Sequence, residues 1–143
     1  MPEQPVRKVA LGDVPANRRR GGDIRVLLSP RTVRAQSGFF GVLTLAAGEY
    51  VSEHYHPYSE EFLYVIAGSV AVRLDGLRQL DLAATEGLLV PEMVRHRVWN
   101  PGAETAVVAF CLTPLAPRPE LGHVDTEPLP SAFGTPPDVG APR

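Results

Sequence analysis

The sequence predicts an all-β domain, an antiparallel sandwich or barrel of about eight short strands. Runs rich in aromatic and β-branched residues recur through the middle of the chain, and Gly, Pro, Asn or Asp interrupts them at short intervals. No segment shows a convincing helical period. The chain has 143 residues, 44% of them hydrophobic, which suits one domain with a core of ordinary size.

An N-terminal arm, residues 1–23, precedes the predicted strands. It is polar, contains prolines and carries the basic run Arg18-Arg19-Arg20 followed by glycines. Because such a run is usually solvated, we expect an exposed arm, with a docking patch for an acidic partner as the alternative.

A β-barrel domain, residues 24–113, follows the arm. Residues 75–76 (Asp-Gly) are expected as a hairpin turn and residues 100–102 (Asn-Pro-Gly) as a later turn, because these residue types favour the backbone angles of tight turns. One strand is expected to carry His54 and His56. The other expected strands lie within residues 23–29, 38–46, 62–66, 69–74, 77–84, 87–90, 94–99 and 105–112.

A proline-rich tail, residues 114–143, ends the chain and holds about half of its 15 prolines. Proline lacks the backbone donor of a strand ladder, so this tail is not expected to form a central strand. We expect residues 113–127 to lie as a strap against the barrel with Leu115, Leu121 and Val124 buried, and roughly the last dozen residues to be mobile.

Charge and composition exclude several classes of function. The formal net charge is −2 and the isoelectric point is about 6.1, which gives no basic face for nucleic acid. The N-terminus lacks the apolar core of a secretory signal, and no apolar run approaches the length of a membrane-spanning helix. The single cysteine, Cys111, rules out an internal disulfide and is expected as a small core residue rather than a nucleophile. We therefore expect a cytoplasmic protein that binds neither nucleic acid nor membrane.

Two histidines, His54 and His56, stand two positions apart in a predicted strand. Alternate side chains of a strand point to one face, so both imidazoles can face the same interior and chelate a metal. The carboxylates Glu60 and Glu61 follow after a predicted turn, and the returning strand can bring one of them to that face. A mixed set of nitrogen and oxygen ligands suits Zn, Fe, Ni or Mn.

A third nitrogen ligand is expected from the two remaining histidines. His96 follows an apolar run and a proline-initiated turn and lies in a second β-type run, whereas His123 sits in the proline-rich tail. His96 is therefore the preferred ligand. His123 is expected as a partly exposed residue, with a role as a distal acid or base at a barrel mouth as the alternative.

These positions resemble the two sequence motifs of the cupin superfamily. The first motif is matched at every marked position, namely Gly48, His54, His56, Glu61 and Gly68. The second is matched at Pro91, His96 and Asn100, while Thr85 and Met93 stand where the family has glycines.

The cupin resemblance implies a double-stranded β-helix, a jelly-roll barrel with a metal held in its mouth. It also implies the ligand set His54, His56, Glu61 and His96, because family spacing to the closing glycine selects Glu61 over Glu60. One divalent transition metal is expected, with zinc slightly favoured over iron, nickel or manganese.

Strand parity predicts which other side chains line the barrel. If the His54 face points inward, so do Tyr50 and Ser52, and if His96 faces inward, so does Val98. An ordinary core position is the alternative for Tyr50. Glu60 would face away or lie in the turn, where it could orient a histidine N–H.

A narrower resemblance covers the arm, the first motif and the tail. The runs N-R-R-R-G-G-D-I-R-V-L-L-S-P-R-T-V, E-H-Y-H-P-Y-S-E-E-F-L-Y-V and P-L-A-P-R-P-E-L-G-H-V-D-T-E resemble the single-domain cupins of bacterial aromatic (type II) polyketide pathways, which include cyclases of the tetracenomycin, resistomycin and spore-pigment type. This implies a metal-dependent enzyme of antibiotic biosynthesis that closes a poly-β-keto chain by aldol-type cyclisation and aromatisation. Tyr50 or Glu60 would transfer protons, and His123 and the arginine run would flank the mouth.

The same resemblance implies a homodimer and a small-molecule polyketide substrate, which an acyl carrier protein could deliver. Two other functions stay open. One is an oxygenase acting on an aromatic, anthrone-like intermediate, since the same ligands can hold Fe or Ni. The other is a non-catalytic sensor or a scaffold of the synthase complex.

Overall fold

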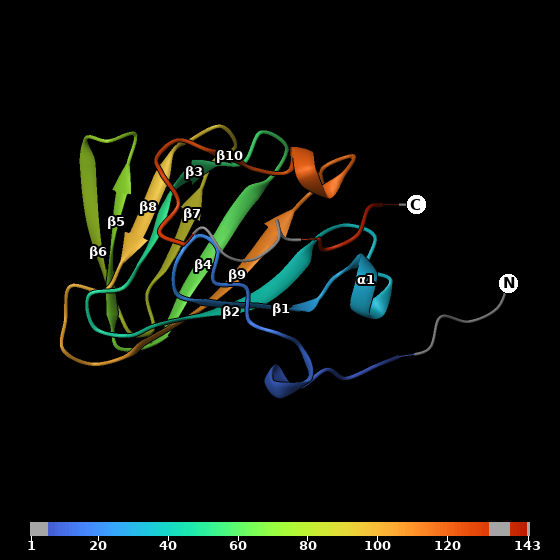
Figure 1. Ribbon diagram of the computed structural model, residues 1–143, viewed down its shortest axis with the longest axis horizontal. Helices are drawn as coiled ribbons and strands as arrows, with labels where there is room; N and C mark the ends of the chain where they lie inside the picture. The colour runs from blue at the N-terminus through green and yellow to red at the C-terminus, as the bar shows by residue number, and fades with distance from the viewer. Residues whose placement is uncertain (1–5, 132–137, 143) are drawn as a thin grey trace, which may run out of the picture.

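The computed structural model describes residues 6–131 and 138–142, and it shows an all-β architecture of two five-stranded antiparallel sheets (Figure 1). The first sheet has the strand order β1-β2-β9-β4-β7 and the second β10-β3-β8-β5-β6. Strands adjacent in space are therefore often distant in sequence. The strands are β1 Asp23–Leu28, β2 Phe39–Leu45, β3 Tyr50–Tyr55, β4 Glu60–Ala67, β5 Ser69–Leu74, β6 Arg78–Ala83, β7 Gly87–Val90, β8 His96–Trp99, β9 Ala106–Thr113 and β10 Val124–Asp125.

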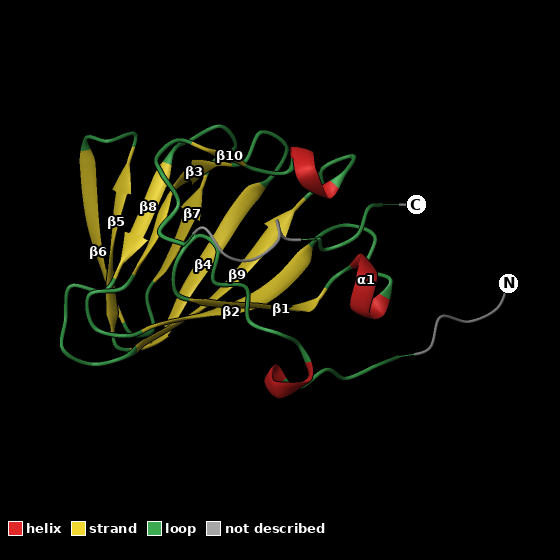
Figure 2. Cartoon of the chain, in the orientation of Figure 1, coloured by secondary structure: helices red, strands yellow, loops and turns green. Residues whose placement is uncertain are grey.

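Short helical segments lie outside the two sheets (Figure 2). The helix α1 (Pro30–Val33) begins at Ser29, whose side chain accepts a hydrogen bond from the Thr32 backbone N–H. Proline at the first helical position is favourable, so Pro30 both ends β1 and starts this turn. Neither α1 nor the two 3-10 turns was predicted, and the latter span Leu11–Asp13 and Pro119–Leu121. Within the described ranges, no helix has the length and apolar character needed to cross a membrane.

The observed strands follow the predicted ones, with shifts at their ends. β7 begins and ends as predicted, whereas β8 begins at His96 because Val94 still belongs to a turn in which its N–H donates to the Pro91 carbonyl at 3.3 Å. The predicted hairpin turn joins β5 to β6. Residues 75–77 separate the paired Leu74 and Arg78, and Asp75 and Gly76 have φ angles of 52° and 72°, the left-handed conformation that favours Asp-Gly in tight hairpins.

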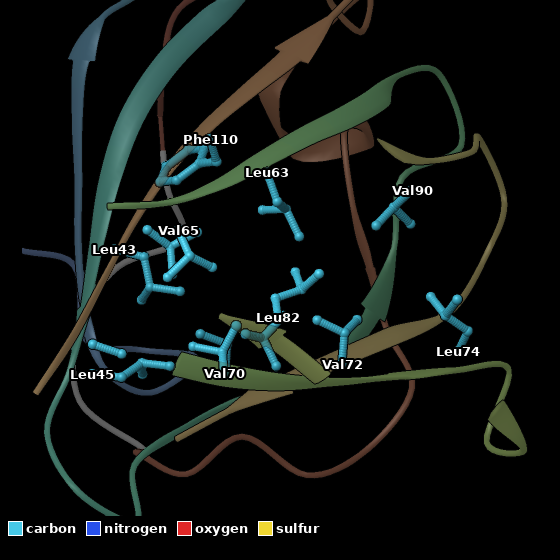
Figure 3. Close-up of a cluster of buried hydrophobic side chains, with 14 of the residues drawn as sticks. Leu43, Leu45, Leu63, Val65, Val70, Val72, Leu74, Leu82, Val90 and Phe110 are labelled. Carbon is cyan, nitrogen blue, oxygen red and sulfur yellow. The ribbon is translucent and has the colours of Figure 1, made fainter. Parts of the chain in front are cut away.

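The hydrophobic core fills the space between the two sheets (Figure 3). Burial alternates along β4 and β9, because successive side chains of a strand point to opposite faces. Each fully buried Leu, Val or Phe contributes about 1.5–3 kcal/mol relative to an exposed position. The labelled core residues are Leu43, Leu45, Leu63, Val65, Val70, Val72, Leu74, Leu82, Val90 and Phe110.

The basic run of the N-terminal arm is not uniformly solvated, which corrects the expectation. Arg18 is exposed and lies within 3.6 Å of Asp23, but Arg20 is only 8% exposed. Its Nε donates to Asp125 of the C-terminal tail at 2.8 Å. Burial of this arginine is possible because that carboxylate accompanies it.

The C-terminal strap pairs with the second sheet, but not through the expected apolar contacts. Val124 and Asp125 form β10 and pair with Tyr55 and His54 of β3. Leu121 and Val124 are 36% and 38% exposed, so their expected burial is wrong, because backbone pairing and polar contacts attach the strap instead.

Most of the last dozen residues, for which mobility was expected, lie outside the described residues (132–137 and 143). Of the remainder, Val139 accepts a hydrogen bond from the Arg31 N–H at 3.1 Å, and Asp138 pairs with the Arg31 side chain. This short segment therefore contacts helix α1.

Candidate metal centre

Three histidines meet inside the barrel, on elements that are distant in sequence. His54 on β3 and His96 on β8 are direct cross-strand partners, and His56 follows the end of β3. Their ring centroids are 4.4, 4.9 and 5.3 Å apart, and all three residues are at most 8% exposed. One nitrogen from each ring lies within 4.8 Å of the other two. A single ion can therefore contact all three imidazoles.

The Nδ1 atom of each ring contacts a backbone carbonyl oxygen. His54 contacts Ser52 O at 2.8 Å, His56 contacts Gly122 O at 2.9 Å and His96 contacts Val94 O at 3.0 Å. A carbonyl oxygen only accepts, so each Nδ1 carries the proton and each Nε2 keeps its lone pair. This is the tautomer that binds metal, oriented by an outer hydrogen bond.

The buried Nε2 atoms fit a metal. Those of His56 and His96 have no hydrogen-bond partner among the described residues, although burial without a partner is costly. Glu61 carboxylate oxygens lie 3.3 and 3.4 Å from these two atoms, beyond the 2.7–2.9 Å typical of a charge-assisted hydrogen bond. An ion between the rings and Glu61 would satisfy all of these atoms.

Glu61 and its neighbour Glu60 point in opposite directions on β4. Glu61 is 8% exposed and faces the histidines, whereas Glu60 is exposed and does not line the cavity. The roles expected for Glu60, orienting a histidine and transferring protons, are therefore wrong, because strand alternation turns its side chain outward. The carboxylate that accompanies the histidines is Glu61.

Burial and mutual charge set the protonation of the site. Burial lowers the pKa of His54 well below its ordinary value, and the charges of His96 and His56 lower it further. At His96 burial lowers the pKa, but the nearby Glu61 carboxylate, 3.4 Å from Nε2, outweighs this and raises it. Burial raises the pKa of Glu61, but the adjacent His56 and His96 imidazoles outweigh it and hold that pKa well below its usual range. The site therefore presents a neutral His54 and an ionised Glu61.

The turn before β8 keeps the family geometry without the family glycine. Met93 has a φ of 71°, and its N–H donates to the His56 carbonyl at 3.0 Å. Thr85, at the other missing glycine, has a φ of 73°. Both positions thus adopt the left-handed conformation that glycine would favour. His96 is placed correctly despite the two departures.

A largely apolar cavity opens over the metal centre. His54, His56, Glu61 and His96 lie in its wall together with Val51 and Val98. Its other walls come from both sheets, the arm and the strap, and include Asn17, Arg20, Val26, Phe39, Phe110, Leu112, Leu115 and His123. Substrate could therefore contact the histidines while most of its surface meets apolar side chains.

A β-bulge reverses the expected parity of β3. Val51 pairs with Val98 and His54 with His96, so one extra residue stands between them on β3. Val51 therefore lines the cavity, whereas Tyr50 and Ser52 do not. Their predicted lining roles are wrong for this reason.

Tyr50 and Ser52 have different surroundings from those predicted. The Tyr50 ring lies under the Arg97 guanidinium, 4.1 Å from its centroid, away from the cavity. Ser52 is fully buried, and its backbone N–H donates to the Arg20 carbonyl. Proton transfer by Tyr50 is therefore unsupported.

Val98 lines the cavity, as strand parity predicted, and so does His123, for which a place at the barrel mouth was the alternative to a partly exposed position. Burial lowers the pKa of His123 to about 4, and the charge of Arg20 adds to this effect. His123 is consequently neutral near pH 7. The resemblance placed the arginine run beside the mouth, and Arg20 does line the cavity. Sequence reasoning did not predict the cavity positions of Val51 and Asn17, because they depend on the bulge and on contacts between distant segments.

The fold and the metal centre define a cupin. Residues 41–113 match the Cupin domain family, and the chain belongs to that family. Two antiparallel sheets that enclose three buried histidines able to hold a metal agree with this assignment.

Some of the proteins that this chain resembles are named for polyketide synthesis. The chain is 58% identical over 127 residues to Protein SchB of Streptomyces halstedii, covering 89% of this chain and 91% of SchB. It is 50% identical over 133 residues to the tetracenomycin polyketide synthase protein TcmJ of Streptomyces glaucescens, covering 93% and 89% of the two chains. The polyketide cyclase RemF of Streptomyces resistomycificus has the same fold, with a TM-score of 0.65 at 19% identity over 76% of this chain and 79% of RemF.

Proposed function

We propose that this cupin is a metal-dependent cyclase that closes a poly-β-keto intermediate by aldol-type cyclisation and aromatisation in an aromatic polyketide pathway. The observation that carries the proposal is the convergence of three metal-binding histidine tautomers and Glu61 on one wall of an apolar cavity. TcmJ and the further relative CurC of Streptomyces cyaneus are both named for polyketide synthesis, and this supports the substrate class.

His54, His56, Glu61 and His96 would hold one divalent ion, with zinc slightly favoured over iron, nickel or manganese. When bound, the ion supplies a Lewis acid for the oxygens of a 1,3-dicarbonyl, whose intervening methylene then loses a proton more readily.

The chain's own residues would control the shape of the substrate and its protons. Val51, Val98 and Phe110 give the cavity apolar walls that exclude water and restrict which carbons of a flexible chain can meet. His123 is neutral near pH 7 because burial lowers its pKa to about 4, so its imidazole can accept a proton from a substrate carbon or pass one to an oxygen. This residue replaces Tyr50 and Glu60 as the candidate for proton transfer.

Product profiling of a reconstituted pathway tests the proposed function. Wild-type protein should redirect an uncyclised poly-β-ketone to a defined aromatic product, and His96→Ala should give the profile of a reaction without the protein. A scaffold role predicts instead that His96→Ala preserves the wild-type profile. If His96→Ala retains the wild-type product profile, the proposal that this protein is a metal-dependent cyclase is wrong.

An oxygenase is the second candidate, because three histidines and one carboxylate also suit iron or nickel. The two functions differ in their need for oxygen. The cyclase should turn over under strict anaerobiosis and the oxygenase should not.

We further infer that the protein forms a homodimer and receives substrate from an acyl carrier protein. The outer face of β4 exposes Phe62, Tyr64 and Ile66 at 46–49%, and Phe62 lies beside Leu89 of β7. Such a row of apolar side chains is a candidate contact between copies of the chain. Analytical ultracentrifugation should give a dimer for the wild type and a monomer for Tyr64→Asp. A pull-down with carrier protein charged with an acyl chain tests delivery.

A further inference from the structure

The Arg20 side chain is buried in the cavity wall with part of its hydrogen-bonding capacity unused. Its residue is 8% exposed, and its Nε donates to Asp125 at 2.8 Å. Its Nη2 is buried and has no hydrogen-bond partner among the described residues. Leaving a buried charged donor unpaired is more costly than leaving a neutral one unpaired, so this geometry calls for an acceptor outside the described residues.

The backbone of the arm fixes Arg20 at this place. Its carbonyl accepts a hydrogen bond from the Ser52 N–H of β3 at 2.9 Å. The chain then turns at Gly21, whose φ is 102°, and a Cβ on this glycine would lie 1.9 Å from the Tyr50 carbonyl oxygen. Only glycine fits there, so the loop is held close to β3 and the guanidinium is directed to the cavity.

The strap orients the guanidinium without using all of its donors. Asp125 belongs to β10, which pairs with His54 of β3, so its carboxylate is tied to the same strand as the metal centre. An arginine offers five N–H donors in a rigid fork, and the Asp125 contact occupies the Nε edge.

The substrate class proposed above carries the missing acceptor. A poly-β-ketone has an oxygen on every second carbon, so a chain held at the histidines through one 1,3-dicarbonyl unit still presents further ketone oxygens. Outside the histidine cluster and Glu61, the other polar side chains of the cavity are Asn17, Ser59 and His123, which carry no charge near neutral pH. Among the described cavity residues, Arg20 is therefore the one arginine or lysine.

We propose that the Arg20 guanidinium binds a ketone or enolate oxygen of the substrate at a point separate from the histidine cluster. This inference rests on the proposed function and deepens it by adding a second oxygen-recognition point. Because a charge-assisted hydrogen bond strengthens as the oxygen gains negative charge, the contact both positions the chain and favours its enolate.

Two small ketones test the proposal by calorimetric titration into zinc-loaded protein. Pentane-2,4-dione has one 1,3-dicarbonyl unit, and heptane-2,4,6-trione adds one ketone. The wild type should bind the trione about 10-fold or more tightly than the dione, beyond the twofold statistical advantage of the trione. Arg20→Met should remove this preference while leaving dione affinity within about threefold and zinc content unchanged.

Matched variants separate recognition from structural damage. Arg18→Met changes an exposed arginine of the same run and should bind like the wild type. Arg20→Lys keeps the positive charge but loses the planar guanidinium with its several N–H donors. Its preference for the trione over the dione should therefore lie between those of the wild type and Arg20→Met. Asp125→Asn keeps the guanidinium and should keep the preference. If Arg20→Met fails to fold, these last two variants decide the question.

The outcomes distinguish this inference from the function on which it rests. If the ketones bind only with metal present but Arg20→Met and Arg20→Lys keep the full preference for the trione, Arg20 does not bind the extra oxygen. If zinc-loaded wild-type protein binds neither ketone, that result contradicts both the proposed function and the role of Arg20.

Discussion

Two groups of residues at the cavity are built in different ways. The floor consists of His54, His56, Glu61 and His96, and the mouth consists of Arg20, His123 and Asp125. At the floor, His54 and His96 are paired across β3 and β8, and Glu61 lies on β4 within a continuous ladder. At the mouth, Arg20 and Asp125 meet although 105 residues separate them, and neither lies on a central strand. Long strand ladders hold the floor, whereas the two-residue strand β10 and a side-chain contact between the arm and the strap hold the mouth.

This difference indicates that the floor serves metal binding and the mouth serves substrate selection. A metal needs ligands held within a few tenths of an ångström, which strands provide. Substrate selection can rest on loops and straps whose contacts change without disturbing the barrel. Changes at the floor should therefore alter metal binding, and changes at the mouth should alter stability or substrate binding while metal content stays constant.

The largest effect should follow loss of a floor histidine. His96→Ala removes a fully buried ligand and should weaken zinc affinity by at least about 100-fold, since even outer-shell changes cost 10–100-fold. His123→Ala, at the mouth, should keep wild-type zinc content. Competition titration with a coloured chelator measures both. An equal loss of zinc affinity in His96→Ala and His123→Ala would contradict the distinction between floor and mouth.

The neighbouring glutamates give the next largest contrast. Glu61→Gln removes the buried carboxylate and should weaken zinc affinity by about 10–100-fold, whereas Glu60→Gln should leave it within about twofold. The same titration applies. A larger effect at Glu60 would show that the register of β4 differs from the one described here.

Stability should change when the strap is released. Glu53 is 6% exposed, accepts from Thr126 Oγ1 at 2.8 Å and lies near Arg73 and Arg95. Glu53→Gln should lower the free energy of unfolding by about 1–3 kcal/mol, less than for a fully buried pair because both arginines are partly exposed. Urea unfolding measures this.

The control for the strap is Glu120→Gln, which removes an exposed ion pair with Arg118. It should be indistinguishable from the wild type in urea. Zinc affinity should be unchanged in both variants, and a loss of zinc in Glu53→Gln would mean that the strap also holds the floor.

The smallest effect concerns the turn that leads to His96. Met93 is 57% exposed and has a φ of 71°, so Met93→Gly should relieve backbone strain and raise the free energy of unfolding by about 0.5–1 kcal/mol. Met93→Ala keeps a Cβ and should give no gain. Thermal unfolding of the metal-free proteins checks this. Destabilisation by glycine would show that the side chain matters more than the angle.

Much of the floor could be predicted from sequence because its rules are local. The spacing of His54 and His56 indicated a chelating pair, and the β-type run around His96 made it the preferred third nitrogen. The choice of Glu61 over Glu60 came from the cupin resemblance, and turn residues placed most strands. The bulge before His54 was not predictable from alternation, since one extra residue reverses parity without a distinct sequence signal.

The mouth resisted prediction because its contacts are not local. The burial of Arg20 depends on Asp125, and the attachment of the strap depends on β3 backbone groups rather than on Leu121 or Val124. The arginine run looked like a solvated arm because composition carries no information about a carboxylate far along the chain.

The central claim is tested most directly by titrating zinc into metal-free protein while following cyclised product in the reconstituted pathway under strict anaerobiosis. Product formation should be absent without metal, rise in proportion to added zinc and level off at about one equivalent for each chain. Full formation of cyclised product by metal-free protein would contradict the account.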